Sequence, residues 1–142
     1  MKIQMLQYFL DKKTAVSAEK LELTAEGGIV GDSHYGPGSR QVALIASEAM
    51  DEIASEPEKG LCYRRYKPNI AADGFNARDY KLGTVIVCGD AELEITERKE
   101  CFPKDCSLPG QGIICPLQRS ASFAKVIKGG TIKIGDEIKI LR

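Results

Sequence analysis

The sequence predicts a single, mainly β domain with one or two short helices. Its length of 142 residues suits one domain that can bury a core without disulfides or metal. The run AELEITE (91–97) alternates strictly between apolar and polar residues, which is typical of a half-buried strand. Gly-Asp turn signals also recur between alternating apolar runs. We therefore expect residues 1–142 to form one β-rich domain.

Further strands follow from short apolar runs that are bounded by Gly, Pro or polar clusters. We expect them at residues 2–9, 20–24, 41–46 and 69–72. The run 84–95 predicts a hairpin that turns at Gly89-Asp90. The run 129–141 predicts a second hairpin around Gly135-Asp136, with apolar positions at Ile132, Ile134, Ile138 and Ile140.

Two segments favour helix. SEAMDEIASE (47–56) begins with the capping residue Ser47, and Met50, Ile53 and Ala54 form a stripe with helical spacing. A second short helix is expected within SASFAKVIKGG (120–130), capped by Ser120 and ended by Gly129-Gly130.

Composition narrows the classes of function. Twenty basic residues balance twenty acidic ones, so neither nucleic-acid nor anionic-membrane binding is indicated. The N-terminal apolar run is too short for a signal peptide, and no run approaches the ~20 apolar residues of a membrane span. We expect a cytoplasmic protein, in which five cysteines argue for thiols, metal ligands or transient redox pairs rather than structural disulfides.

The segment KECFPKDC (99–106) is the main candidate for chemistry. Lys99 and Lys104 flank Cys101, and nearby cations favour the reactive thiolate form. The alternative is that Cys101 ends a strand and packs as a small apolar residue. Cys101, Cys106 and Cys115 could also hold zinc, although their spacing lacks the C-x2-C knuckle of strong zinc motifs.

The other two cysteines carry less information. Cys88 lies in an apolar alternating run and is expected in the core. Cys62 stands beside a basic run and its role stays open.

The Gly-rich stretch GGIVGDSHYGPGSRQVALI (27–45) is the second candidate. It contains the only histidine of the chain, His34, and then Arg40 just before an apolar strand. Such a loop can cradle an anion or can simply be a turn, and a lone histidine can be a proton shuttle, a ligand or a structural residue. Arg40 could form a basic rim able to hold phosphate or a pterin-like anion, or part of a solvated charged face. The other members of that rim would be Arg64, Arg65 and Lys67.

Several stretches together resemble the MOSC domain, which occurs at the C-terminus of molybdenum cofactor sulfurases and as small stand-alone bacterial proteins. They are GIVGDSHYGPGSRQVALI, KPNIAADGFN, LGTVIVCGDAELEIT, KECFPKDC and FAKVIKGGTIKIGDEIKI, in the family's order and over nearly the whole chain. The resemblance implies a mainly β, single-domain β-barrel and a role in sulfur transfer linked to the molybdenum cofactor. The family's characteristic cysteine falls on Cys101, which is expected to carry a persulfide.

The resemblance also implies further site residues. Gly31, Asp32, His34 and Arg40 match the family's loop, and Asn69 matches similarly. A histidine commonly follows the site cysteine in short relatives, whereas this chain has Phe102 and Pro103 there. If that histidine helps to ionise the thiol or to bind a metal, this chain would use Lys99, Lys104 or His34 instead or be less active, and we count Lys99 among the site residues. Cys106 and Cys115 match further cysteines, which could resolve the persulfide as a disulfide or bind metal with Cys101.

Three functions remain open on the sequence. The first is a sulfurtransferase-like carrier loaded by a separate cysteine desulfurase and serving a molybdoenzyme or cofactor-synthesis protein. The second is a binding module for molybdopterin or molybdenum without turnover, with Cys101 as a direct ligand. The third is a zinc or redox domain built on the three clustered cysteines. Pyridoxal phosphate is not expected, because in fused relatives it belongs to a separate domain.

Overall fold

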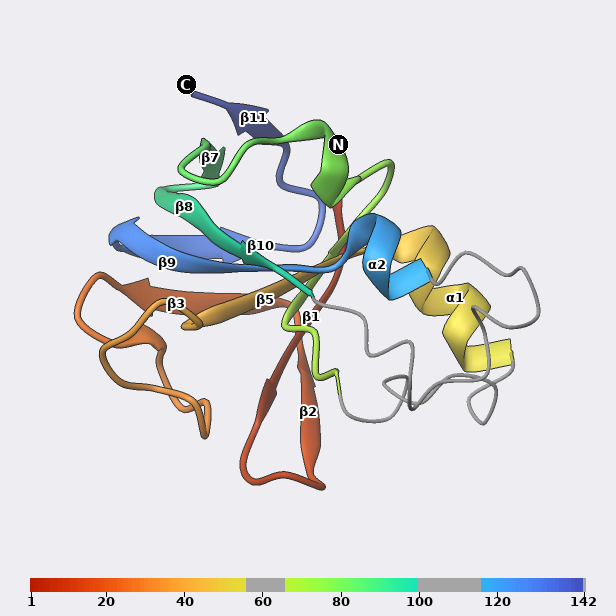
Figure 1. The fold of residues 1–142 in the computed structure, drawn as a ribbon. Coiled ribbons are helices and arrows are strands. Elements are labelled where there is room, and N and C mark those ends of the chain that lie inside the picture. Colours follow the sequence, from red (N-terminus) through yellow and green to blue (C-terminus); the bar gives the residue numbers. More distant parts are fainter. Residues whose placement is uncertain (56–65, 100–115, 142) are drawn as a thin grey trace.

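The computed structural model describes residues 1–55, 66–99 and 116–141 (Figure 1). An eight-stranded sheet has the order β11-β7-β8-β9-β5-β6-β1-β2, and a three-stranded sheet has the order β10-β3-β4. The strands are β1 (Ile3–Phe9), β2 (Ala15–Ala18), β3 (Lys20–Thr24), β4 (Gly28–Ile29), β5 (Val42–Ala46), β6 (Ile70–Ala72), β7 (Val85–Cys88), β8 (Ala91–Arg98), β9 (Ser122–Lys128), β10 (Gly130–Lys133) and β11 (Ile138–Ile140). The helices are α1 (Ser47–Ser55), the 3-10 turn η1 (Ala77–Asp79) and α2 (Pro116–Ser120).

The mainly β prediction is confirmed, whereas a closed barrel is not. The ladder of the large sheet ends at β11 on one side and at β2 on the other. Backbone hydrogen bonds from Ile3 N to Asp136 O (2.9 Å) and from Ile138 N to Met1 O (2.7 Å) tie the start of β1 to the region where β11 begins. The edge strand β11 is thus linked to the start of β1, the strand next to the other edge, and the barrel stays a prediction.

The hairpin at Gly89-Asp90 is confirmed. β7 and β8 pair antiparallel, with Cys88 opposite Ala91. The predicted strands at 2–9, 20–24, 41–46 and 69–72 correspond to β1, β3, β5 and β6. The short strands β2 and β4 were not predicted, because neither has an apolar run long enough to stand out.

The predicted C-terminal hairpin is wrong. A turn does form, because Lys133 N donates to Asp136 Oδ2 (2.8 Å) and Gly135 has a φ of 92°. The two strands then separate: β10 pairs with β3 and β11 pairs with β7. Ile132 and Ile138 are buried, while Ile134 and Ile140 are exposed. The turn chemistry was read correctly, but the strands find better partners in two different sheets.

The predicted helix at 120–130 is also wrong. Residues 122–128 form strand β9, and the helix α2 lies just before them. β9 pairs with both β5 and β8, and Ser122, Ala124 and Val126 point into the core. Pairing on both edges outweighs the weak helical preference of this segment. The helix at 47–56 is confirmed as α1, with Ala49 buried and Met50 and Ile53 packed against the core.

The two helices lie together at one end of the sheet (Figure 1). Arg119 of α2 donates to Glu52 of α1 across the contact (2.8 Å). No helix in the described part of the chain is long and apolar enough to cross a membrane.

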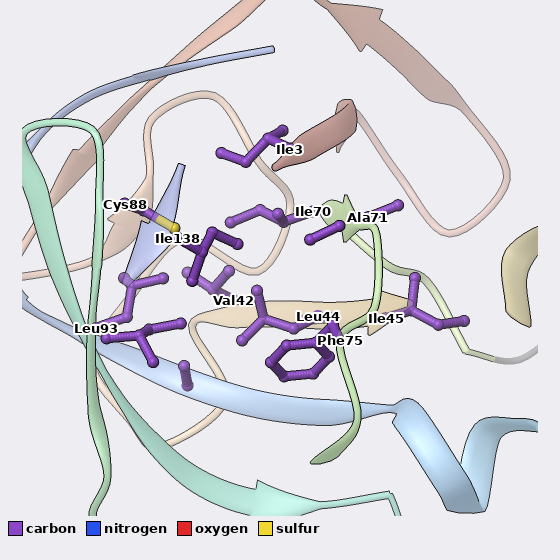
Figure 2. Packing of buried hydrophobic residues seen from close by; sticks show 14 of the residues in the cluster. Ile3, Val42, Leu44, Ile45, Ile70, Ala71, Phe75, Cys88, Leu93 and Ile138 are labelled. Carbon is purple, nitrogen blue, oxygen red and sulfur yellow. The ribbon is translucent and has the colours of Figure 1, made fainter. Parts of the chain in front are cut away.

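Buried apolar side chains from both halves of the large sheet meet in one core (Figure 2). Val42, Leu93 and Ile138 come from strands far apart in the sequence and gather near Cys88 (Figure 2). Cys88 is fully buried, which confirms its predicted core position. Burial raises the pKa of the Cys88 thiol to about 12, so this sulfur stays a thiol at neutral pH.

Candidate functional site

A pocket of about 570 Å³ lies where the β1–β2 turn, the Gly-rich loop and the ends of β5, β8 and β9 converge. Four predicted site residues line it, namely His34, Arg40, Asn69 and Lys99, together with Lys67 of the predicted basic rim. The remaining lining residues are Lys12, Lys13, Ala43, Tyr66 and Phe123. The structure thus brings together residues that are up to 111 positions apart, from Lys12 to Phe123.

Asp32 holds the loop that carries His34 through hydrogen bonds to the backbone. Its carboxylate is fully buried and accepts hydrogen bonds from Phe9 N (2.8 Å) and His34 N (3.0 Å). The same carboxylate lies 3.3 Å from His34 Nδ1, while the His34 side chain is 55% exposed. The acid is therefore fixed by the backbone of β1, and the histidine sits at the surface of the pocket.

Asn69 locks this arrangement to the sheet. Its Nδ2 donates to Gln7 O (3.2 Å) and, at 3.4 Å, to Asp32. Its Oδ1 accepts from Ala43 N (3.0 Å). An amide can donate and accept at once, which explains why a buried asparagine suits a position between β1 and β5.

The glycines of the loop have structural roles. The Tyr35 ring lies on Gly27 so closely that a Cβ there would come within 2.3 Å of it. The Tyr35 hydroxyl is 3.0 Å from Thr24 Oγ1, which fixes the ring on β3. Gly31 has a φ of 90°, a backbone conformation that residues other than glycine rarely adopt. These contacts set the path of the loop that carries His34.

Arg40 forms the opposite wall of the pocket. Its Nε and Nη2 each donate to the Glu97 carboxylate at 3.0 Å, a bidentate pair. Ser39 Oγ donates to the same carboxylate (2.8 Å). The Arg40 and Ser39 hydrogen bonds hold the pKa of Glu97 below its usual range. The guanidinium also lies over the Phe123 ring, 4.5 Å from its centroid, which favours a cation–π contact.

Tyr66 closes the base of the pocket. Its buried hydroxyl lies 2.7 Å from both Leu44 O and Ser122 O, so it clasps β5 to β9. Burial raises the pKa of Tyr66, and its ring meets Phe123 edge-on with centroids 5.5 Å apart. The phenol is therefore a structural group rather than an acid.

The lysines at the β1–β2 turn were missed by the sequence reasoning. Asp11 accepts from Lys13 N (2.7 Å) and Thr14 N (2.9 Å), and these bonds lower the pKa of Asp11. This Asx-type turn presents Lys12 and Lys13 to the pocket. The sequence DKKT contained a turn signal with two basic residues at its tip, which could have identified them.

The pocket is strongly cationic. Lys12, Lys13, Lys67, Lys99 and Arg40 all line it. Among the described residues around it, the Asp32 and Glu97 carboxylates are engaged with His34 and Arg40. The positive charges and the Asn69 carboxamide suit a compact anion. The two aromatic rings suit a flat apolar part of the same ligand.

The predicted Cys101, Cys106 and Cys115 lie outside the described residues, as do Cys62, Arg64, Arg65 and Lys104. Strand β8 ends at Arg98, so Lys99 follows it rather than continuing its alternation. Within residues 1–55, 66–99 and 116–141, no cluster of three or more histidine, cysteine or acidic side chains could hold a metal ion.

Comparison with solved structures finds similar folds at low sequence identity. YuaD from Bacillus subtilis matches with a TM-score of 0.71 at 23% identity, over 98% of this chain and 94% of YuaD. YiiM from Escherichia coli, a MOSC domain protein, matches with a TM-score of 0.62 at 16% identity, over 100% of this chain and 70% of YiiM. This chain has a MOSC-like fold.

YiiM from Geobacillus stearothermophilus also has a similar fold, with a TM-score of 0.58 at 16% identity over 99% of this chain and 73% of YiiM. A scan of family models found no match, and neither did a search of curated proteins. The resemblance read from the sequence is therefore confirmed at the level of the fold, and these identities carry nothing about activity.

Proposed function

We propose that this MOSC-like domain is a sulfur carrier that acts on a compact anionic acceptor bound in the cationic pocket. Cys101 would carry the sulfur as a persulfide, and the molybdenum cofactor would be the acceptor, as the sequence resemblance to MOSC domains suggests. A separate cysteine desulfurase would load the carrier.

The main support is the convergence of His34, Arg40, Asn69 and Lys99 on one pocket. The family resemblance and the charges in the sequence indicate these residues independently of where they lie in the fold. Two residues of chain span at most about 7 Å, and Cys101 follows the pocket residue Lys99 by two positions in the sequence. A carrier cysteine needs to act beside its acceptor, so this proximity along the chain fits the proposal.

The donor set fits an anionic cofactor. Arg40, Lys99 and the two lysines of the β1–β2 turn would hold phosphate or other anionic oxygens, and Asn69 adds a polar group between them. The cofactor would supply a molybdenum centre that accepts sulfur. The pocket's own contribution is to concentrate negative charge and to favour a thiolate nearby.

Loading of the carrier is a balanced thiol–persulfide exchange. The Cys101 thiolate attacks the outer sulfur of a persulfide on the donor protein. A sulfur–sulfur bond forms at Cys101 while the bond to the donor cysteine breaks. The donor sulfur leaves as a thiolate and takes up the proton that Cys101 released, so no outside oxidant or reductant is needed.

A cofactor-binding module without turnover is the second candidate. The cationic lining would hold the cofactor whether or not sulfur is transferred, and this observation supports binding on its own. In that case the protein retains molybdopterin, Cys101→Ser loses molybdenum, and no persulfide forms. A zinc or redox domain on Cys101, Cys106 and Cys115 would instead show near-stoichiometric zinc or a reversible disulfide.

Intact-protein mass spectrometry separates these functions. After incubation with a cysteine desulfurase and cysteine, the carrier gains the mass of one sulfur atom, and a thiol reductant removes it. Cys101→Ser should show no gain, whereas Cys106→Ser, as the matched control, should still be loaded. A wild-type protein without the adduct, or an adduct that persists in Cys101→Ser, would rule out the carrier.

A further inference from the structure

Strand β8 contains one extra residue where it passes the pocket. Ile95 lies opposite Ala124 of β9. Two residues further along β8, Glu97 lies opposite Phe123 rather than Ser122, so the register shifts by one residue. Ser122 is buried, and an uninterrupted register would direct Glu97 to the same side of the sheet. The shift instead brings the Glu97 carboxylate to the side on which Phe123 lines the pocket, and bulges often redirect a side chain in this way next to a functional site.

The Glu97 carboxylate is bound by the end of the Gly-rich loop. Arg40 Nε and Nη2 each donate to it at 3.0 Å, and Ser39 Oγ donates to it at 2.8 Å. The Thr96 hydroxyl donates to Ser39 O, which holds the loop against the shifted strand. The Arg40 guanidinium lies over the Phe123 ring, 4.5 Å from its centroid. A cation that lines the pocket is thus engaged by a carboxylate of the protein itself.

We propose that Glu97 is an internal competitor for the ligand of the pocket: it binds Arg40 in the absence of ligand and is displaced from Arg40 by an anionic group with two acceptor oxygens. The pair is suited to exchange, because 59% of the Arg40 side chain and 35% of the Glu97 side chain are exposed to water. Glu97 meets the guanidinium with both of its oxygens, so a phosphate or carboxylate group can take its place with the same geometry.

The charge of Glu97 supports competition. The carboxylate offsets the charge of the guanidinium that it binds, so a ligand meets a pair with no net charge at this wall of the pocket. Lys12, Lys13 and Lys67 line the same pocket and attract the anion before Arg40 is released. A competitor lowers the affinity for the ligand. A role in holding Arg40 ready for the ligand would have the opposite effect, so the sign of the change on removing Glu97 decides between them.

This inference deepens the proposed function and rests on it only for the premise that the pocket binds an anion. It names the class of group that Arg40 receives, which is a phosphate or carboxylate rather than a monoatomic anion. It does not depend on sulfur transfer.

Isothermal titration with inorganic phosphate at low ionic strength tests the competition. Glu97→Gln should bind phosphate about fivefold more tightly than the wild type, because the amide keeps the size of the side chain but loses its charge. Glu94→Gln is the matched control, since Glu94 is on the same strand, lies 3.7 Å from Lys125 and is outside the pocket lining. Its affinity should stay within about twofold of the wild type. Unchanged or weaker binding by Glu97→Gln, or no binding by either protein, would overturn the proposal.

A double variant, Arg40→Gln with Glu97→Gln, shows whether Glu97 acts through Arg40. Without Arg40 there is no cation to compete for, so the gain from Glu97→Gln should shrink to about twofold or less in this background. An equal gain in both backgrounds would mean that Glu97 only repels the ligand, and would refute the exchange. Circular dichroism and thermal melts of each variant verify that the fold is retained.

The requirement for two oxygens is tested in the wild type, without any substitution. Acetate and chloride carry the same charge, but only acetate presents two oxygens to a guanidinium. The apparent affinity for phosphate should be at least about threefold weaker in sodium acetate than in the same concentration of sodium chloride. Equal affinities in the two salts would contradict the proposed class of ligand.

The two proposals fail in different ways. If Glu97→Gln gains affinity for phosphate but the wild type is never loaded with sulfur, the carrier function is wrong and the competition stands. If sulfur is loaded normally while Glu97→Gln gains no affinity, the proposal for Glu97 is wrong and the carrier stands.

Discussion

Two basic side chains that line the pocket, His34 and Arg40, are each paired with a carboxylate, and the two pairs differ in how far the carboxylate is removed from water. Asp32 is fully buried and held by backbone N–H groups of β1 and of its own loop as well as by His34. Glu97 is 35% exposed and is held by the side chains of Arg40 and Ser39. Because Asp32 is buried, its contacts stabilise the fold. Arg40 and Glu97 are exposed, so each can exchange its partner for water or for a ligand.

The largest expected effect comes from breaking the buried pair. Asp32→Ala leaves Phe9 N and His34 N without this acceptor and Asn69 Nδ2 with Gln7 O alone, so the free energy of unfolding should fall by about 3 kcal/mol. Chemical denaturation measures this loss. The control Glu97→Ala should cost less than about 1 kcal/mol, because water can replace an exposed partner. Equal losses in the two variants would contradict the comparison.

Tyr66→Phe separates the effect of burial from that of charge. The Tyr66 hydroxyl is buried but neutral, and its removal leaves Leu44 O and Ser122 O without this donor. We expect a loss of about 1–2 kcal/mol in the free energy of unfolding, again by denaturation. A loss as large as that of Asp32→Ala would mean that burial alone decides the cost, and no loss would show that the clasp between β5 and β9 is not needed.

Arg40→Gln tests whether the exposed pair belongs to a binding site. Inorganic phosphate should bind about tenfold more weakly to this variant, a change of about 1.4 kcal/mol, because one of the cations that line the pocket is lost. Isothermal titration at low ionic strength measures the affinity. Lys133→Gln, an exposed position on β10 outside the pocket, should leave phosphate binding unchanged.

The smallest expected effect is a pH dependence of the exposed pair. The folded-state pKa of Glu97 is lowered by Arg40 and Ser39, so its stabilisation is fully present above the ordinary carboxyl pKa and disappears as the pH falls through the lowered value. The difference in stability between wild type and Glu97→Gln should therefore shrink toward acid pH. Thermal melts across the acid range would show it, and a difference that grows toward acid would contradict this sign.

Local signals allowed much of the fold to be predicted. Strand alternation found β8, and the Gly89-Asp90 turn joined it to β7. The errors arose where pairing partners are distant. The Gly135-Asp136 turn forms, but no local pattern in residues 129–141 indicates that β10 pairs with β3 and β11 with β7. The segment of β9 has a weak helical pattern, and only its two neighbouring strands decide against it.

The candidate site shows the same division. Charge and resemblance selected His34, Arg40, Asn69 and Lys99, which the structure places around one pocket. Lys12 and Lys13 were missed because their importance depends on where the β1–β2 turn lies relative to the loop of His34. Tyr66 and Phe123 were missed because an aromatic residue by itself more often indicates core packing than a binding site.

The sequence by itself determined a β-rich chain, its main turns, one buried cysteine and a set of basic residues with one histidine, since these follow from short-range periodicity and from side-chain chemistry. Only the tertiary structure decided which strands pair, that five cations share one pocket, and that Asp32 is buried under His34 while Glu97 stays in water. These features depend on contacts between segments far apart in the chain. Burial, which decides how strongly a charged group interacts with its neighbours, is a property of the folded chain alone.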